Sequence, residues 1–228
     1  MSNLTSPQDN KLLSALAQSQ FSLLAPNLII KDLPQGQVLL EAGEEFERVY
    51  FPLNGMLSLL VVMRDGKAIE TATVGREGVV GAMAGLGLYK SSVRVVVQLA
   101  LTVAEMSAAQ FRKAVDKSEA IRNLCLEYNE DLLFHARVTA ACNALHPVEA
   151  RFSRWLLQTA DRAASETIQL TQEFLSEMLG VQRTSISEVA GHLQRLGMIE
   201  YSRGVITIID RKALVKCSCE CYETLREH

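Results

Sequence analysis

The sequence has few aromatic residues, little excess of positive charge and no long apolar run. Of its 228 residues 6% are aromatic, and 23 Lys and Arg are outnumbered by 26 Asp and Glu. The net charge of −3 argues against a generic polycation that coats nucleic acid, but leaves room for a local DNA-reading surface. The longest stretch without a charged residue, 49–63, is shorter than the roughly 20 apolar residues of a membrane span. We therefore expect no membrane partner.

Cysteine is scarce and odd in number, with five residues in the chain. The first residues lack a basic start followed by an apolar block, so we expect no secretory signal and a reducing, cytoplasmic location with free thiols. Cys217, Cys219 and Cys221 form a C-x-C-x-C pattern near the end of the sequence. Zinc and iron–sulfur sites usually need four ligands. We interpret the pattern as a reduced, surface-facing tail, Cys125 and Cys142 as packing residues, and expect no metal or other cofactor.

Signatures of catalysis are also missing. The sequence contains no G-x-S-x-G, P-loop or G-x-G-x-x-G run. A roll-shaped enzyme of the cupin type would hold a metal through strand histidines. All four histidines lie outside the strand-rich region, at positions 135, 146, 192 and 228. We therefore expect a protein that is not an enzyme.

Residues 27–107 consist of short apolar runs separated by glycines. Strands at this spacing with turn signals between them predict an all-β sandwich or barrel. Within MRDGKAIETATV, Asp65-Gly66 supplies the turn of a hairpin. The expected strands are 28–30, 38–40, 49–51, 56–63, 68–74, 93–99 and 102–106.

A long helix is predicted from about Glu119 to Leu145, after a shorter helix that begins at Ser107 and Gln110 with a capping pattern. Its apolar residues recur every three or four positions, as in a coiled-coil seam. The helix could pack on its own domain, but the length of the stripe favours a dimer helix. The stripe consists of Ile121, Leu124, Cys125, Tyr128, Leu132, His135, Val138, Cys142 and Leu145.

Pro147 interrupts the helical pattern, because the residue before proline is disfavoured in the α region. We place a domain boundary here. The expected division is an N-terminal strand-rich domain over 1–118, a dimerisation helix over 119–146, and a C-terminal domain over 147–228. The predicted class is α+β, with an N-terminal all-β sandwich or barrel followed by helices.

The winged helix-turn-helix is predicted within residues 170–209. Thr171 is a good N-cap for a helix over 172–179. Gly180 supplies a tight turn, a second helix covers 183–196, and Gly197 ends it. Two short apolar stretches, 198–201 and 205–209, then form the wing hairpin. We expect Ile186, Val189, Leu193 and Leu196 to point inward.

The start of the second helix is polar, which is what a helix in the major groove requires. Arg183 can pair with guanine through two hydrogen bonds, Glu188 can accept from cytosine, and Thr184 can contact a thymine methyl. The opposing interpretation is an ordinary helical hairpin with polar surface residues. The net charge of −1 over residues 147–228 also argues against DNA binding. The candidate DNA-binding residues are Thr171, Gln182, Arg183, Thr184, Ser185, Ser187, Glu188 and Arg203, with Thr171, Ser185 and Arg203 assigned to phosphates.

The order of these parts resembles the Crp/Fnr family of bacterial transcription regulators over nearly the whole chain. The segments EAGEEFERVYFPLNG and VGREGVVGAM look like the turns of its cyclic-nucleotide-binding roll. TQEFLSEMLGVQRTSISEVAGHLQRLGMIE is similar to its DNA-reading motif. The resemblance implies an α+β chain with a double-stranded β-roll (jelly roll) as sensory domain over 1–118, the dimerisation helix, and a winged helix-turn-helix DNA-binding domain over 147–228. It also implies a cytoplasmic homodimer that binds two-fold sites on double-stranded DNA and recruits or blocks RNA polymerase. The alternative is a protein-interaction module with a degenerate roll.

The chain departs from the family pattern in its candidate effector pocket. In cyclic-AMP-binding members a Gly-Glu pair and an Arg-Ser pair hold the ribose and the phosphate. Here Gly81 matches the glycine, Ala82 replaces the glutamate, and Arg94 is the nearest arginine. Because alanine cannot accept the ribose hydrogen bond, we expect no cyclic nucleotide. The iron–sulfur sensor of Fnr-type members uses cysteines near the N-terminus, whereas the first cysteine here is Cys125.

The recognition helix departs from the family as well. Arg183 matches the arginine of cyclic-AMP-type members, but Thr184 replaces the expected glutamate and Glu188 the expected arginine. The resemblance therefore implies a DNA half-site that differs from those of well-known members.

Overall fold

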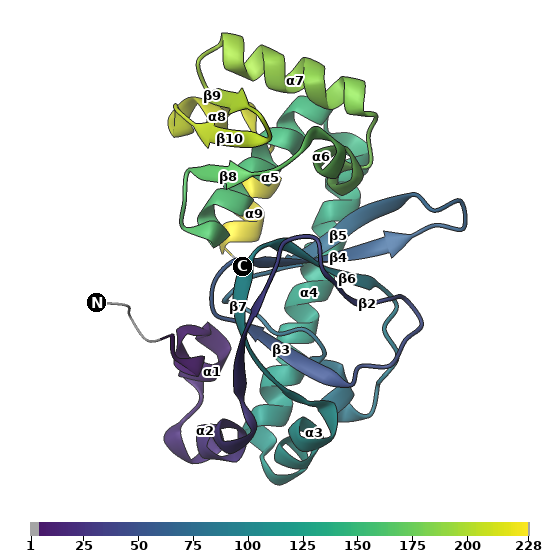
Figure 1. The fold of residues 1–228 in the computed structure, drawn as a ribbon, viewed down its shortest axis with the longest axis vertical. Coiled ribbons are helices and arrows are strands. Elements are labelled where there is room, and N and C mark those ends of the chain that lie inside the picture. Colours follow the sequence, from purple (N-terminus) through teal and green to yellow (C-terminus); the bar gives the residue numbers. More distant parts are fainter. Residues whose placement is uncertain (1–4, 228) are drawn as a thin grey trace. The chain divides into compact units, whose positions relative to one another are not determined.

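The computed structural model describes residues 5–227, which fold into two compact units of mixed helix and sheet (Figure 1). Unit 1 contains the described residues up to Val61 together with Thr73–Leu133. Unit 2 contains Val62–Ala72 and the chain from Phe134 onward. Within the described part of the chain, no helix is both long and apolar enough to span a bilayer.

The roll consists of two antiparallel sheets, ordered β1-β7-β3 and β2-β6-β4-β5. Each of the seven predicted strands is present, with ends shifted by at most three residues. The β4–β5 hairpin turns at Gly66, whose φ of +86° suits glycine. The strands are β1 (Ile29–Leu33), β2 (Val38–Leu40), β3 (Arg48–Pro52), β4 (Met56–Val62), β5 (Ala68–Val74), β6 (Arg94–Leu99) and β7 (Leu101–Ser107).

Apolar side chains from both sheets fill the roll, and helices close it. Phe51 of β3 meets Phe111 of α3 (Ala108–Lys117) edge to face, with ring centroids 5.9 Å apart. Ser107 caps α3 as predicted, accepting from the Gln110 N–H. Leu13 and Leu24 are buried in the same core. Leu13 lies in α1 (Lys11–Ala15) and Leu24 in α2 (Gln18–Leu24). The short helices η1 (Pro7–Asp9) and η2 (Ala25–Asn27) come before and after this pair.

The long helix α4 spans Glu119–Leu145, as predicted, but its apolar stripe is not a free seam. Ile121, Cys125 and Tyr128 are buried in the core of the roll. Interpreting this half of the stripe as a dimer surface is therefore wrong, because the helix has apolar residues on two faces and this face covers its own domain. Leu126 and Leu133, seven residues apart, are 49% and 40% exposed on another face.

Unit 2 is built around α5, with a short sheet of order β8-β10-β9. Phe152, Trp155 and Leu156 on α5 are buried, so this face forms the centre of the unit. Of these elements, sequence analysis predicted α6, α7, β9 and β10. The elements are α5 (Val148–Ala163), β8 (Thr167–Gln169), α6 (Gln172–Leu179), α7 (Arg183–Arg195), β9 (Ile199–Ser202), β10 (Val205–Ile208), α8 (Arg211–Cys217) and α9 (Cys221–Glu227).

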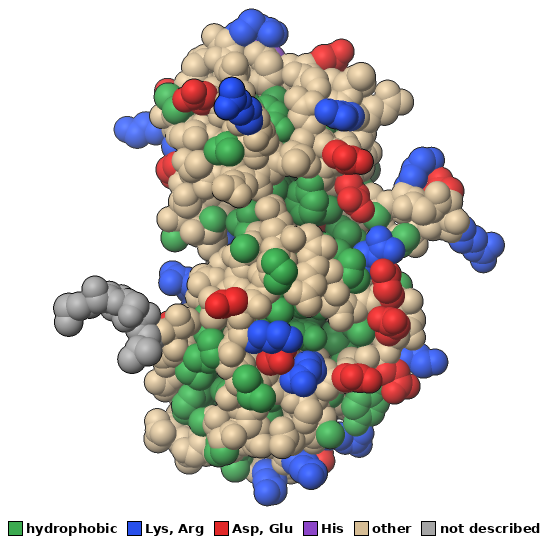
Figure 2. Space-filling model, viewed as in Figure 1, with side chains coloured by type: hydrophobic (Ala, Val, Ile, Leu, Met, Phe, Trp, Pro, Cys, Tyr) green, Lys and Arg blue, Asp and Glu red, His purple; other side chains and the backbone are tan. Residues whose placement is uncertain are grey.

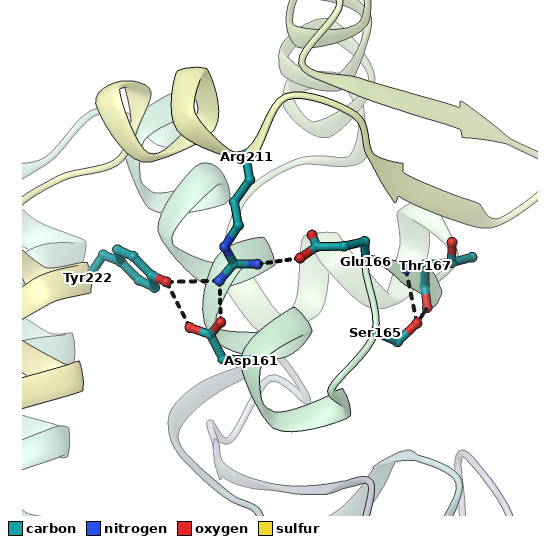
Figure 3. Close-up of polar contacts among 6 residues, drawn as sticks. All are labelled: Asp161, Ser165, Glu166, Thr167, Arg211 and Tyr222. Carbon is teal, nitrogen blue, oxygen red and sulfur yellow. Dashed lines mark hydrogen bonds and ion pairs between the residues drawn. The ribbon is translucent and has the colours of Figure 1, made fainter.

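Arg211 joins four segments of unit 2 through one polar network (Figure 3). Its guanidinium donates to Glu166 Oε1 at 2.9 Å and to the Tyr222 hydroxyl at 3.0 Å, and it forms an ion pair with Asp161. The Tyr222 hydroxyl in turn donates to Asp161 at 2.8 Å. The end of α5, the approach to β8, and helices α8 and α9 are thereby connected.

We predict that Arg211→Ala lowers the free energy of unfolding of unit 2 by about 1–2 kcal/mol, since charge-assisted hydrogen bonds are lost and partial exposure weakens each of them. Urea denaturation of the full chain measures the change. Lys212→Ala, an exposed neighbour on the same helix, is the control. Equal effects of the two variants would contradict a role for the network.

Candidate nucleic-acid interface

Helices α6 and α7 are separated by a tight turn that local residues impose. Thr171 Oγ1 accepts from the Phe174 N–H at 3.2 Å and caps α6. Gly180 ends α6 in the left-handed region at a φ of +61°. The chain then needs only Val181 and Gln182 before α7 begins at Arg183. Helix, turn and helix thus follow the bounds predicted from sequence.

Helix α7 has an apolar inner face and a polar outer face. Ile186, Ala190 and Leu193 are buried. Val189 is half-buried, and the expectation that Leu196 points inward is wrong: it forms the C-cap and is 53% exposed, while Ala190 takes the inner position. Of the predicted base-reading positions, Ser185 is half-buried, and the exposed ones are Gln182, Arg183, Thr184, Ser187 and Glu188.

Gln172, which sequence analysis did not single out, holds two of these residues. Its Oε1 accepts from the Ser187 hydroxyl at 2.9 Å and from Arg183 Nε at 3.4 Å. Ser187 also donates to the Arg183 carbonyl at 3.1 Å. The only signal in the sequence was a polar residue next to the N-cap. The first helix therefore orients the start of the second.

The wing is a tight hairpin between β9 and β10. Arg203 has a φ of +50° and Gly204 of +78°, which gives a two-residue turn with Arg203 exposed at its tip. The Leu170 N–H donates to Gly204 O at 2.7 Å, and the Tyr201 hydroxyl donates to Leu170 O at 3.2 Å. The wing is thereby anchored beside the start of α6, and partial burial raises the pKa of Tyr201.

Charge on unit 2 is mixed rather than segregated. On the face of this unit seen in Figure 2, Lys and Arg side chains lie singly among Asp and Glu. This agrees with the net charge of −1 over residues 147–228. A surface of this kind holds DNA through selected contacts more than through a broad positive field.

The roll contains a small cavity of about 110 Å³ that includes two of the three predicted effector residues. Gly81 and Ala82 line it. Arg94 does not: it pairs with Glu41, its Nε lying 2.8 Å from Glu41 Oε2. The walls are almost entirely apolar. The lining is Phe46, Leu59, Val79, Val80, Gly81, Ala82, Met83, Val93, Tyr128, Asn129 and Leu132.

A larger hollow of about 460 Å³ lies elsewhere on the roll. Glu44, Glu45 and Glu47 line it, and Arg48 at its edge is already paired with Glu105 at 2.9 Å. Three carboxylates against one paired cation disfavour an anionic ligand such as a nucleotide phosphate.

Two of the three C-terminal cysteines are buried, which corrects their interpretation as a surface-facing tail. Cys219 in the link between α8 and α9 and Cys221 at the start of α9 pack against Cys142 of α4. A hydrogen bond from Cys219 and the nearby charge of Arg154 lower the pKa of Cys142. Cys217 lies apart, with its thiol 3.6 Å from Met198 Sδ. The turn after α8 was not visible in the C-x-C-x-C spacing.

Comparison with known proteins gives two matching families. Residues 30–118 match the cyclic nucleotide-binding domain, and residues 150–217 match the Crp-like helix-turn-helix domain. The HTH-type transcriptional regulator Cmr of Mycobacterium tuberculosis is 26% identical over 202 residues, covering 87% of this chain and 80% of Cmr.

Solved structures show the same fold at low sequence identity. A CRP-family transcriptional regulator from Thermus thermophilus has a TM-score of 0.70 at 18% identity, covering 84% of this chain and 99% of its own. FixK2 from Bradyrhizobium japonicum has a TM-score of 0.70 at 16% identity, covering 84% and 98%. Likeness at this level supports the architecture alone.

We predict that Thr171→Ala lowers the free energy of unfolding of unit 2 by about 1 kcal/mol, because the first turn of α6 loses its cap. Thr171→Ser retains the accepting hydroxyl and should keep most of that stability. Urea denaturation, with hydrogen exchange of the α6 amides, measures both variants. Identical behaviour of alanine and serine would contradict the capping role.

Proposed function

The chain belongs to the Crp/Fnr family of DNA-binding transcription regulators, and on that premise we propose that it reads a two-fold DNA site as a homodimer. Helix α7 enters the major groove of each half-site, and the wing lies along the backbone. In this proposal residues 1–118 are the sensory domain, 119–146 the dimerisation helix and 147–228 the DNA-binding domain. The family is one of transcription regulators rather than of enzymes, and we assign this chain no catalytic activity.

The outer face of α7 carries this proposal. Arg183, Thr184 and Glu188 are exposed at its start, while the opposite face is buried. Gln172 restrains the Arg183 side chain through Nε, which leaves the terminal nitrogens of the guanidinium available for a guanine. An arginine already oriented loses less conformational entropy when it pairs with a base. Gln182 and Ser187 complete the base-facing set.

Phosphate contacts are assigned to Thr171, Ser185 and Arg203. Thr171 lies at the N-terminus of α6, where the amides and hydroxyl favour a phosphate oxygen. Arg203 projects from the wing tip. Such contacts position the protein on the duplex without reading sequence.

The homodimer is supported by the second apolar face of α4. Leu126, Leu133 and Ala140 are exposed and recur every seven residues, the spacing at which two helices form a common seam. Because the opposite face is committed to the roll, this face is free to meet a second copy. A homodimer in turn requires two half-sites about 34 Å apart, or one helical turn.

We further propose that the roll regulates the protein through the apolar cavity beside Gly81 and Ala82. We also propose that the protein is cytoplasmic and that it contacts RNA polymerase at promoters. The cavity lining favours a small apolar effector over cyclic AMP. The alternative, a protein-interaction module with a degenerate roll, does not account for a polar outer face on α7 held in place by α6.

Selection of random duplex DNA by the purified protein, followed by sequencing, should enrich a two-fold motif. Arg183→Ala should lose preference at one position of each half-site, at a cost of about 1–3 kcal/mol. Arg195→Ala, which removes a charge from the far end of the same helix, should leave the motif unchanged. If the Arg183→Ala variant keeps full sequence selectivity, the placement of α7 in the major groove is wrong. A DNA pool that is not enriched under any condition would refute sequence-specific DNA binding.

Cyclic AMP should leave DNA affinity unchanged, because Ala82 offers no acceptor for the ribose and Arg94 is paired with Glu41. Fluorescence anisotropy with the selected duplex, at millimolar cyclic AMP and without it, measures this. A gain of about ten-fold or more, equivalent to 1.4 kcal/mol, would overturn the assignment.

A further inference from the structure

Four potential metal ligands converge in unit 2, none of them on α7. Cys142 lies in the last turn of α4, and His146 follows one turn later. The backbone N–H of His146 donates to the Cys142 carbonyl at 3.1 Å. Cys219 comes from the link between α8 and α9, and Cys221 is the first residue of α9. One ligand atom from each of the four lies within 4.8 Å of the others. We propose that these residues bind a single divalent ion with the preferences of zinc, in a Cys₃His site.

The spacing of the ligand atoms fits one ion. With Zn–S near 2.3 Å and Zn–N near 2.0–2.1 Å, the edges of a tetrahedron around zinc are about 3.5–3.8 Å. The Cys142 and Cys219 Sγ atoms are 3.5 Å apart, and Cys221 Sγ is 3.7 Å from His146 Nδ1. Ligands of an iron–sulfur cluster are carried on different irons and lie farther apart. A single tetrahedral ion is therefore the better match.

His146 is oriented for coordination through Nδ1. Its other ring nitrogen, Nε2, lies 3.2 Å from Glu220 Oε1. A carboxylate on the far nitrogen of a ligating histidine fixes the ring and raises its basicity, an arrangement common around zinc. Glu220 lies between the two cysteine ligands in the sequence, so three consecutive residues, 219–221, supply two ligands and the supporting carboxylate.

Positive charge next to the four ligands can balance the negative charge of a zinc ion bound by three thiolates. Zn²⁺ with three thiolates and a neutral histidine carries one net negative charge, which is costly in a buried place unless balanced. Arg151 and Arg154 of α5 are both buried beside these cysteines. Arg151 donates to the side-chain oxygen of Asn143 and the Leu179 carbonyl, and Arg154 donates to the side-chain oxygen of Gln158; none of these acceptors is a carboxylate. The charge of a buried arginine is thus available to offset that of the metal site.

Metal binding would attach the end of the chain to the end of α4. Helices α8 and α9 have seven residues each, a length that is not stable as isolated helix. A closed four-ligand site supplies folding free energy directly. The inferred role is structural, and it concerns the link after α8 rather than the DNA-reading helix.

The full-length protein should be purified under reducing conditions with added zinc, and its metal content measured after gel filtration. We expect about one zinc per chain, and cobalt substitution should give the absorption bands of tetrahedral thiolate coordination. Cys219→Ser should lose both signals. Cys217→Ser is the matched control, since it removes a cysteine two positions away that lies outside the cluster, and it should retain both.

A second variant covers the case in which Cys219→Ser fails to fold. Glu220→Gln keeps all four ligands but weakens the support of His146, so zinc affinity measured by competition with a chelator should fall by about 10–100-fold. Unchanged affinity in this variant, zinc retained by Cys219→Ser, or a metal-free wild type would each overturn the proposal. Iron with acid-labile sulfide after anaerobic purification, or a Cys142–Cys219 disulfide in place of bound metal, would overturn it in favour of a cluster or a redox pair.

Discussion

The burial of one face of α5 is the constraint on which unit 2 depends. Phe152, Trp155 and Leu156 project from a single side of this helix into the interior, and α6, α7, α8, α9 and β8 all contact it. The hydrophobic effect, at roughly 25 cal/mol per Å² of buried apolar surface, holds these elements together without a disulfide. Helix α7 therefore packs against α5. Its Ile186 and Leu193 are buried, and the exposed side chains of its first two turns are polar.

The same helix carries two buried arginines, which is unusual because an unpaired buried charge is costly. Arg151 meets part of that cost by donating to the Leu179 carbonyl at the end of α6, just before the turn at Gly180. It also donates to Asn143 on α4 at 3.1 Å. One side chain thus joins the end of α6 to the end of α4. Trp155 adds a further buried polar contact, its indole N–H donating to Glu70 at 2.8 Å.

Much of the fold could be predicted because local residues determine it. Thr171, Gly180 and Gly197 define the ends of α6 and α7, and the glycine-separated apolar runs correspond to the strands of the roll. What periodicity could not reveal was which face of a long helix is covered: α4 has two apolar faces, and only the packed chain shows that Tyr128 faces the roll and Leu133 does not. Five candidate reading residues, 182–184, 187 and 188, are exposed as expected, whereas Ser185 is half-buried. Gln172 and the convergence of Cys142 with Cys219 depend on contacts across many residues, which no local pattern encodes.

Several contacts in unit 2 join residues that are far apart in the sequence, which affects how the chain folds during synthesis. Cys142 and Cys219 are 77 positions apart, and Glu70 and Trp155 are 85 apart. Contacts of this kind close large loops and form late. During synthesis the roll can assemble as soon as α4 has emerged, because its strands and the first half of that helix are complete by then. Unit 2 must wait for α8, α9 and the link between them, so the nascent chain carries a finished roll and an open second unit until these residues have been made.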